Sequence, residues 1–245
     1  MGRGVTGVNN NKKIGYIMVS SRKGIIIKSL LLLAALWVVS GCHSAKKGND
    51  AFNVYEYDQK FRTKYIMAFP ELAKEILDYT KMSEGVCIDI GCGPGYLGLA
   101  IAEISRFQIY SLDISPQAIE LTKKYVIERN LAGRVFPVVG DVHKLPYSDR
   151  FADLVVSRGS LPFWTDKTTA FREIKRVLKQ GGMAYIGCGF GAGYKKISED
   201  RAFKNKRPPK RFTHESILKS LVDAGITNYT VIDDYNKGYW IIIRN

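Results

Sequence analysis

The residues best suited to chemistry are an aspartate and several glycines in VCIDIGCGPG, residues 86–95. A run of β-formers ends there in Gly91, Gly93 and Gly95, and apolar residues then recur at helical spacing in residues 96–105. This pattern predicts a strand, a glycine turn and a helix. Glycine lets a ligand approach the backbone and a helix N-terminus offers free N–H groups, so we expect a nucleotide-type ligand at the turn.

Two classes of ligand use such a turn, and the glycines alone do not separate them. Gly93, Gly95 and Gly98 fit the G-x-G-x-x-G pattern of dinucleotide sites, with Asp113 at the spacing of a ribose-binding acid. Asp89, however, lies inside the strand just before the glycines. A carboxylate there would repel a pyrophosphate and attract an ammonium and a sulfonium, both of which S-adenosylmethionine carries.

With this turn, the chain resembles the class I S-adenosylmethionine-dependent methyltransferases, specifically their methyltransferase type 11 branch. The resemblance covers roughly residues 65–190 and includes LKQGG at 178–182, where the branch usually has LKPGG. It implies an α/β fold: a doubly wound, seven-stranded Rossmann-like sheet, mostly parallel, with a C-terminal antiparallel hairpin. A dinucleotide dehydrogenase would not require that hairpin.

The resemblance also implies which residues bind the cofactor, S-adenosylmethionine. Asp89 would neutralise the methionine ammonium, Asp113 would hold the ribose hydroxyls, and Asp141 would meet the adenine amino group. The full predicted set is Asp89, Gly91, Cys92, Gly93, Gly95, Asp113, Ile114, Asp141, Val142 and Ser157.

Four further residues are candidate contacts of the methyl acceptor, namely Tyr55, Tyr57, Arg158 and Trp164. The two tyrosines, expected just ahead of the first helix, suit a sulfonium through cation–π attraction, although core or edge packing would also explain them. Arg158 ends the fourth strand, at the sheet edge where ligands of open α/β sheets bind. It indicates an anionic acceptor or, alternatively, a salt bridge to a loop acid.

No catalytic base and no metal site are predicted. Many small-molecule members of the branch carry histidines after the fourth strand, where this chain has residues 161–164, LPFW. His143 and His214 lie elsewhere, and we expect both to be polar surface residues.

The coarse layout outside the motif is predicted from periodicity. Aromatic residues in 51–69 share one helical face, and a second helix is expected at 70–80. A capped amphipathic helix is expected within 213–226, and residues 228–234 and 239–245 read as the final hairpin.

The basic residues are concentrated in two stretches. The chain has 37 Lys and Arg against 23 Asp and Glu, yet residues 1–48 contain eight bases and no acid, and residues 195–211 contain eight bases and two acids. The remainder is balanced, so no nucleic-acid partner is expected. The stretch 195–211 indicates attraction for an anionic acceptor or acidic lipid headgroups, or else a solvated loop.

Residues 1–42 are predicted to be a targeting segment ahead of a methyltransferase domain at 50–245. Basic residues in 20–28 precede ten apolar residues, 30–39, and then Ser40, Gly41 and Cys42, an order that resembles the bacterial lipobox. The expected localisation is therefore membrane-associated through a lipid on Cys42, with a cytoplasmic protein as the alternative. Because S-adenosylmethionine is a cytosolic metabolite, export would separate the enzyme from its co-substrate.

These features favour an S-adenosylmethionine-dependent methyltransferase that acts on a small-molecule acceptor, anionic or membrane-associated. The alternative is a membrane-tethered protein that binds S-adenosylmethionine without catalysis. Neither the acceptor's identity nor the oligomeric state is predicted.

We predict that Cys42 carries a lipid and begins the mature chain when the protein is expressed with its native N-terminus in a bacterium. Acyl chains on one cysteine anchor a protein firmly without a spanning helix. The intact mass measures this directly, with Cys42→Ser as the control that should remain an uncleaved precursor. A wild-type chain that retains residue 41 and an unmodified Cys42 would contradict lipidation.

Overall fold

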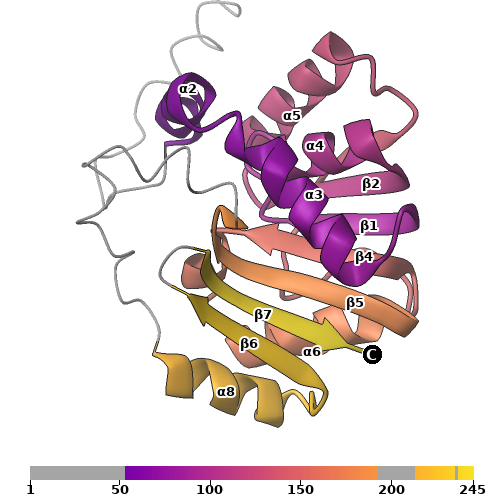
Figure 1. Ribbon diagram of the computed structural model, residues 1–245, viewed down its shortest axis with the longest axis vertical. Helices are drawn as coiled ribbons and strands as arrows, with labels where there is room; N and C mark the ends of the chain where they lie inside the picture. Colours follow the sequence, from indigo (N-terminus) through magenta and orange to yellow (C-terminus); the bar gives the residue numbers. More distant parts are fainter. Residues whose placement is uncertain (1–52, 192–212, 235–236) are drawn as a thin grey trace, which may run out of the picture. The chain divides into compact units, whose positions relative to one another are not determined.

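The computed structural model describes residues 53–191, 213–234 and 237–245 (Figure 1). A seven-stranded sheet forms its centre, in the order β3-β2-β1-β4-β5-β7-β6. Strand β7 lies between β5 and β6 and is antiparallel to both. The strands are β1 Glu84–Ile90, β2 Arg106–Asp113, β3 Val135–Val139, β4 Ala152–Arg158, β5 Leu178–Gly189, β6 Tyr229–Asp234 and β7 Gly238–Arg244.

Helices cover both faces of the sheet. α3, α4 and α5 lie on one face, and α6 and α8 lie on the other (Figure 1). The helices are α2 Val54–Lys64, α3 Ala68–Thr80, α4 Tyr96–Ile104, α5 Pro116–Glu128, the short 3-10 helix η1 Leu161–Phe163, α6 Lys167–Val177 and α8 His214–Asp223. This arrangement is the expected doubly wound α/β fold.

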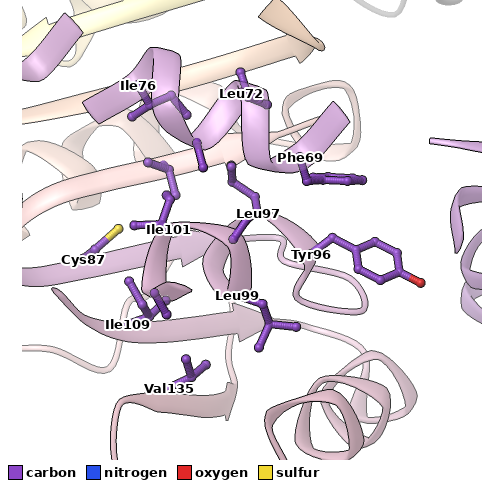
Figure 2. Packing of buried hydrophobic residues seen from close by; sticks show 14 of the residues in the cluster. Phe69, Leu72, Ile76, Cys87, Tyr96, Leu97, Leu99, Ile101, Ile109 and Val135 are labelled. Carbon is purple, nitrogen blue, oxygen red and sulfur yellow. The ribbon is translucent and has the colours of Figure 1, made fainter. Parts of the chain in front are cut away.

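Helix α4, which follows the glycine turn, is held between α3 and the sheet. All its residues from Tyr96 to Ala102 are buried. Figure 2 shows Leu72 and Ile76 of α3 above α4, with Ile109 of β2 beneath. Burial on both sides places the N-terminus of α4 firmly at the carboxyl end of β1.

The first helical region differs from the prediction. The boundary between the two expected helices lies earlier in the chain, because α2 ends at Lys64 and α3 already begins at Ala68. The Asn53 side chain accepts hydrogen bonds from the backbone N–H groups of Tyr55 and Glu56 and so starts α2 ahead of the tyrosines. Tyr55 and its neighbour Tyr57 therefore lie inside the helix rather than before it.

Several sequence features lie outside the described residues. These are the segment 1–42 with Cys42, and the basic stretch 195–211. Within the described ranges, no helix combines the length and the apolar character needed to cross a membrane.

Candidate functional site

The glycine turn sits at the carboxyl end of β1 and is tied to the end of β2. The carbonyl oxygen of Leu112 accepts hydrogen bonds from the N–H groups of Gly91 at 2.7 Å and Cys92 at 3.0 Å. Gly91, Gly93 and Gly95 have φ values of 64°, 55° and 81°. This left-handed conformation strongly favours glycine.

The three glycines do not all make room for a ligand, which corrects the sequence-based expectation. A Cβ at Gly91 would lie 2.3 Å from Cβ of Ser160, and one at Gly95 would lie 2.6 Å from Cγ2 of Thr122. At these two positions, glycine therefore leaves room for side chains of the protein itself. Among the described residues, a Cβ at Gly93 would meet only the Tyr57 ring, at 4.0 Å, so Gly93 is the glycine of the three with open space beside it there.

Cys92 lies beside the turn and against α5. Its thiol sulfur is 3.8 Å from the hydroxyl oxygen of Thr122, and burial raises the pKa of the thiol well above its ordinary value. The Thr122 hydroxyl also lies 2.9 Å from the carbonyl oxygen of Gly93, to which it can donate. These contacts fasten the middle of the turn to α5.

Asp113 joins the turn to the start of α5. One carboxylate oxygen accepts the Gly93 N–H at 2.8 Å, and the other accepts the Ser115 N–H at 2.9 Å. A carboxylate has about four acceptor sites, so both oxygens can still accept from ribose hydroxyls. The next residue, Ile114, is 70% exposed and offers an apolar surface beside this carboxylate.

Asp141 follows β3 and is oriented by His143. One Asp141 oxygen accepts the His143 backbone N–H at 2.9 Å and lies 2.6 Å from its ring Nδ1. Both hydrogen bonds lower the pKa of Asp141, and the bond from the His143 backbone has the larger effect. The His143 Nε2 atom accepts the Asp166 N–H at 3.2 Å, so Nδ1 is the protonated nitrogen. His143 thus positions Asp141 and does not supply a free base, while Val142 is buried beside them.

Asp89 lies beneath the turn with only 1% of its surface exposed. One oxygen accepts the Gly98 N–H in the first turn of α4, at 3.0 Å. The pKa of Asp89 is raised to about 7, mainly by burial. The hydrogen bond from Gly98 opposes this rise, and the charge of Asp113 adds to it. Asp89 therefore supports the N-terminus of α4, and its contact with a ligand ammonium stays a prediction.

Ser157 and Trp164 are placed behind the turn, and their contacts with the cofactor and the acceptor stay predictions. Ser157 is fully buried, with its hydroxyl oxygen 2.6 Å from that of Ser160. The Trp164 ring is in the core, and its Nε1–H donates to the Ser160 hydroxyl at 3.1 Å. Ser160 in turn donates to the Ile90 carbonyl at 3.2 Å. Both predicted residues thus hold Ser160 against Gly91.

Arg158 and Tyr57 form the side of the site that α2 covers. The guanidinium of Arg158 donates to the Tyr57 hydroxyl at 3.0 Å and to the Gly189 carbonyl at 2.9 Å. The central guanidinium carbon, Cζ, lies 3.9 Å from the centre of the Phe190 ring. It lies 5.0 Å and 5.3 Å from the ring centres of Phe61 and Phe69.

The structure leaves both predicted alternatives for this guanidinium open. Among the described residues, no carboxylate pairs with Arg158, and the acids of the stretch 195–211 lie outside those residues. Tyr55 is 53% exposed, and in the described part of the chain its side chain makes no hydrogen bond or ring contact. Tyr57, but not Tyr55, therefore faces the turn.

Sequence reasoning missed Asp58, the next residue of α2. Its carboxylate is 8% exposed and accepts hydrogen bonds from the hydroxyls of Tyr96 and Tyr125. The available signal was its position four residues after Val54 and three before Phe61, on the apolar face of the helix.

One cavity, of about 340 Å³, includes the first residue of β5 in its lining and so lies away from the turn. Arg172 and Lys175, which line it, donate to the carbonyls of Asp223 and Gly225 at the C-terminal end of α8, at 3.0 and 2.6 Å. Capping of a helix C-terminus accounts for these cations. Among the described residues, no group of three potential ligands could hold a metal ion.

Comparisons with known proteins agree with this geometry. A family described as methyltransferase domain matches residues 88–186. A solved structure from Methanococcus maripaludis, assigned as an S-adenosyl-L-methionine-dependent methyltransferase, is 36% identical, with a TM-score of 0.73 over 82% of this chain and 97% of that one. A SAM-dependent methyltransferase from Aquifex aeolicus, 18% identical with a TM-score of 0.60, covers 79% of this chain and 97% of its own and shows the fold alone.

Curated relatives match over shorter lengths. The malonyl-[acyl-carrier protein] O-methyltransferase of Methylovorus sp. is 35% identical over 116 residues, 44% of this chain and 38% of that protein. A chloroplastic 2-methyl-6-phytyl-1,4-hydroquinone methyltransferase of rice is 37% identical over 100 residues, 40% of this chain and 29% of that protein. The match thus spans well under half the length of either.

The buried Asp89 should make stability depend on pH. Because its pKa rises on folding from 3.8 to about 7, the folded state binds more protons between those values. The free energy of unfolding should therefore fall as pH rises through this window, by at most roughly 4 kcal/mol. Asp89→Asn keeps an acceptor for Gly98 but removes the titration, so urea unfolding from pH 4.5 to 8 should show a flatter profile. Asp78→Asn, at an exposed residue of α3, is the control, and an unchanged slope in Asp89→Asn would contradict this.

Proposed function

Because the chain belongs to the S-adenosylmethionine-dependent methyltransferases, we propose that it transfers a methyl group from this cofactor to a small molecule bearing an anionic group. The observation that carries the transferase part is the arrangement at Gly93. Its Cα faces open space, and its N–H is bonded to the Asp113 carboxylate at 2.8 Å.

The residues at this turn fit the parts of the cofactor. Gly93 leaves room for its methionine part, and Asp113 has acceptor capacity left for two ribose hydroxyls. The exposed Ile114 and the oriented carboxylate of Asp141 suit the face and the amino group of adenine. When bound, the cofactor supplies a methyl group on a cationic sulfonium.

The chain's contribution is alignment and exclusion of water. Tyr57 presents an aromatic ring next to Gly93, where it can attract a positive charge and shield the reacting atoms from solvent. Both nitrogens of His143 are engaged away from the turn. We therefore assign no general base among the described residues, and positioning of donor and acceptor carries the proposed rate enhancement.

Arg158 supports an anionic acceptor. Its half-buried guanidinium rests on aromatic rings and has no carboxylate partner among the described residues. A desolvated cation without a counter-ion is costly, so an anionic group of the acceptor would stabilise this arrangement. The basic stretch 195–211 follows soon after β5 and adds attraction for anions.

The apolar segment before Cys42 extends this proposal to a membrane-associated acceptor. Anchored near a bilayer, the basic stretch 195–211 would be drawn to acidic headgroups by on the order of 1 kcal/mol per basic residue. An acceptor dissolved in the lipid would then be within reach of the site.

The purified full-length protein should bind S-adenosylhomocysteine, the demethylated product, but not NAD. Asp113→Ala should weaken this binding by roughly 1.5–3 kcal/mol, as expected for hydrogen bonds to a charged group. Calorimetry measures both, with Asp78→Ala as a control in an exposed carboxylate of α3. Tight NAD binding would contradict the assignment. Binding without methyl transfer to any component of a cell extract would favour the non-catalytic alternative.

The acceptor's anionic group should depend on Arg158. Once an extract fraction that accepts labelled methyl groups is found, Arg158→Gln should raise the apparent KM for it about tenfold or more, as for a lost charge-assisted hydrogen bond. Arg158→Lys keeps the charge and should lose less. Affinity for S-adenosylhomocysteine should change far less than the KM in both, as a check on folding. Equal KM values in wild type and Arg158→Gln would rule out this role.

A further inference from the structure

Asp58 is a buried carboxylate to which the proposed chemistry assigns no task. Its oxygens accept the Tyr125 hydroxyl at 2.9 Å and also the Tyr96 hydroxyl. Within the described residues, no lysine or arginine pairs with it. A buried charge is costly unless it is hydrogen-bonded, so the two phenols are what make this position tenable.

The two phenols belong to the elements that frame the glycine turn. Tyr96 is the first residue of α4, directly after Gly95, and Tyr125 lies in α5. Figure 2 shows the Tyr96 side chain extending away from the packed core residues, with its hydroxyl at the far end. Burial and the bond to Asp58 raise the pKa of both phenols, so they remain donors.

Helix α2 is also attached by apolar packing. Its buried residues are Val54 and Asp58, and the partly buried ring of Phe61 packs against the core. Tyr57, next to Asp58, reaches to 4.0 Å from a Cβ position at Gly93 and accepts from Arg158. Neighbouring residues of one helix thus make contacts on two sides of the turn. The hydrogen bonds of Asp58 join α2 to α4 and α5, which adds to this apolar packing, so their loss should loosen the helix.

We propose that Asp58 is a positioning residue for the cofactor site: its bonds to Tyr96 and Tyr125 fasten α2 across the glycine turn and keep Tyr57 over Gly93. The inference rests on the proposed function in taking Gly93 as part of the cofactor site. Opening of this fastening would uncover the turn while the sheet stays folded, since α2 contributes no strand to the sheet.

Hydrogen exchange of the full-length protein tests the fastening without any cofactor. In Asp58→Ala, amides of residues 54–64 should exchange about tenfold faster or more, while β1 and β4 exchange as in wild type. Gln59→Ala, the adjacent exposed position, is the matched control and should behave as wild type. Tyr125→Phe removes one donor and should give a smaller increase that is not additive with Asp58→Ala.

Cofactor dissociation is the second readout. Asp58→Ala should release S-adenosylhomocysteine about tenfold faster, and Asp58→Asn, which keeps an acceptor oxygen, should fall between it and wild type. Unchanged exchange in 54–64, or equal acceleration throughout the sheet, would overturn the proposal. A wild-type protein that binds no S-adenosylhomocysteine would refute the proposed function, and the exchange experiment would still decide the role of Asp58.

Discussion

The site depends on the connection between the carboxyl ends of β1 and β2. The Leu112 carbonyl accepts two N–H groups of the glycine turn, and the next residue, Asp113, accepts a third. These bonds hold a left-handed backbone in place and leave the open side of Gly93 next to the acid that is expected to bind ribose. The buried helix α4 then fixes the direction in which the turn leaves the sheet.

The shape of the glycine turn also depends on the side chains that pack against it. Ser160 fills the place of a side chain at Gly91 and is itself held by Ser157 and Trp164. Thr122 does the same at Gly95. The glycines and these partners therefore form one packed unit, and the residues that a sequence motif singles out act together with residues that it does not contain.

Much of the fold could be predicted from local pattern, because strands that end in glycine or acid and alternate with amphipathic helices leave few topologies open. The family resemblance added the acids at the strand ends, and the structure brings Asp113 and Asp141 to the same edge as Gly93. The positions of Ser157, Trp164 and Asp58 could not be read in this way. Their partners are set by tertiary packing, as with Asp58 and Tyr125, which lie 67 residues apart.

The order of the last strands affects how the chain can fold during synthesis. Strand β6 pairs only with β7 in the described sheet, and β7 in turn pairs with β5. The ribosome makes β6 first, so β6 has no partner until β7 has emerged. Part of the packing of helix α8 also comes late, since its buried Ile217 and Leu221 lie in the same cluster as Ile241 and Ile243 of β7. Until then the outer side of β5 is an unpaired edge, the kind of surface on which a nascent chain is open to chaperones and to aggregation.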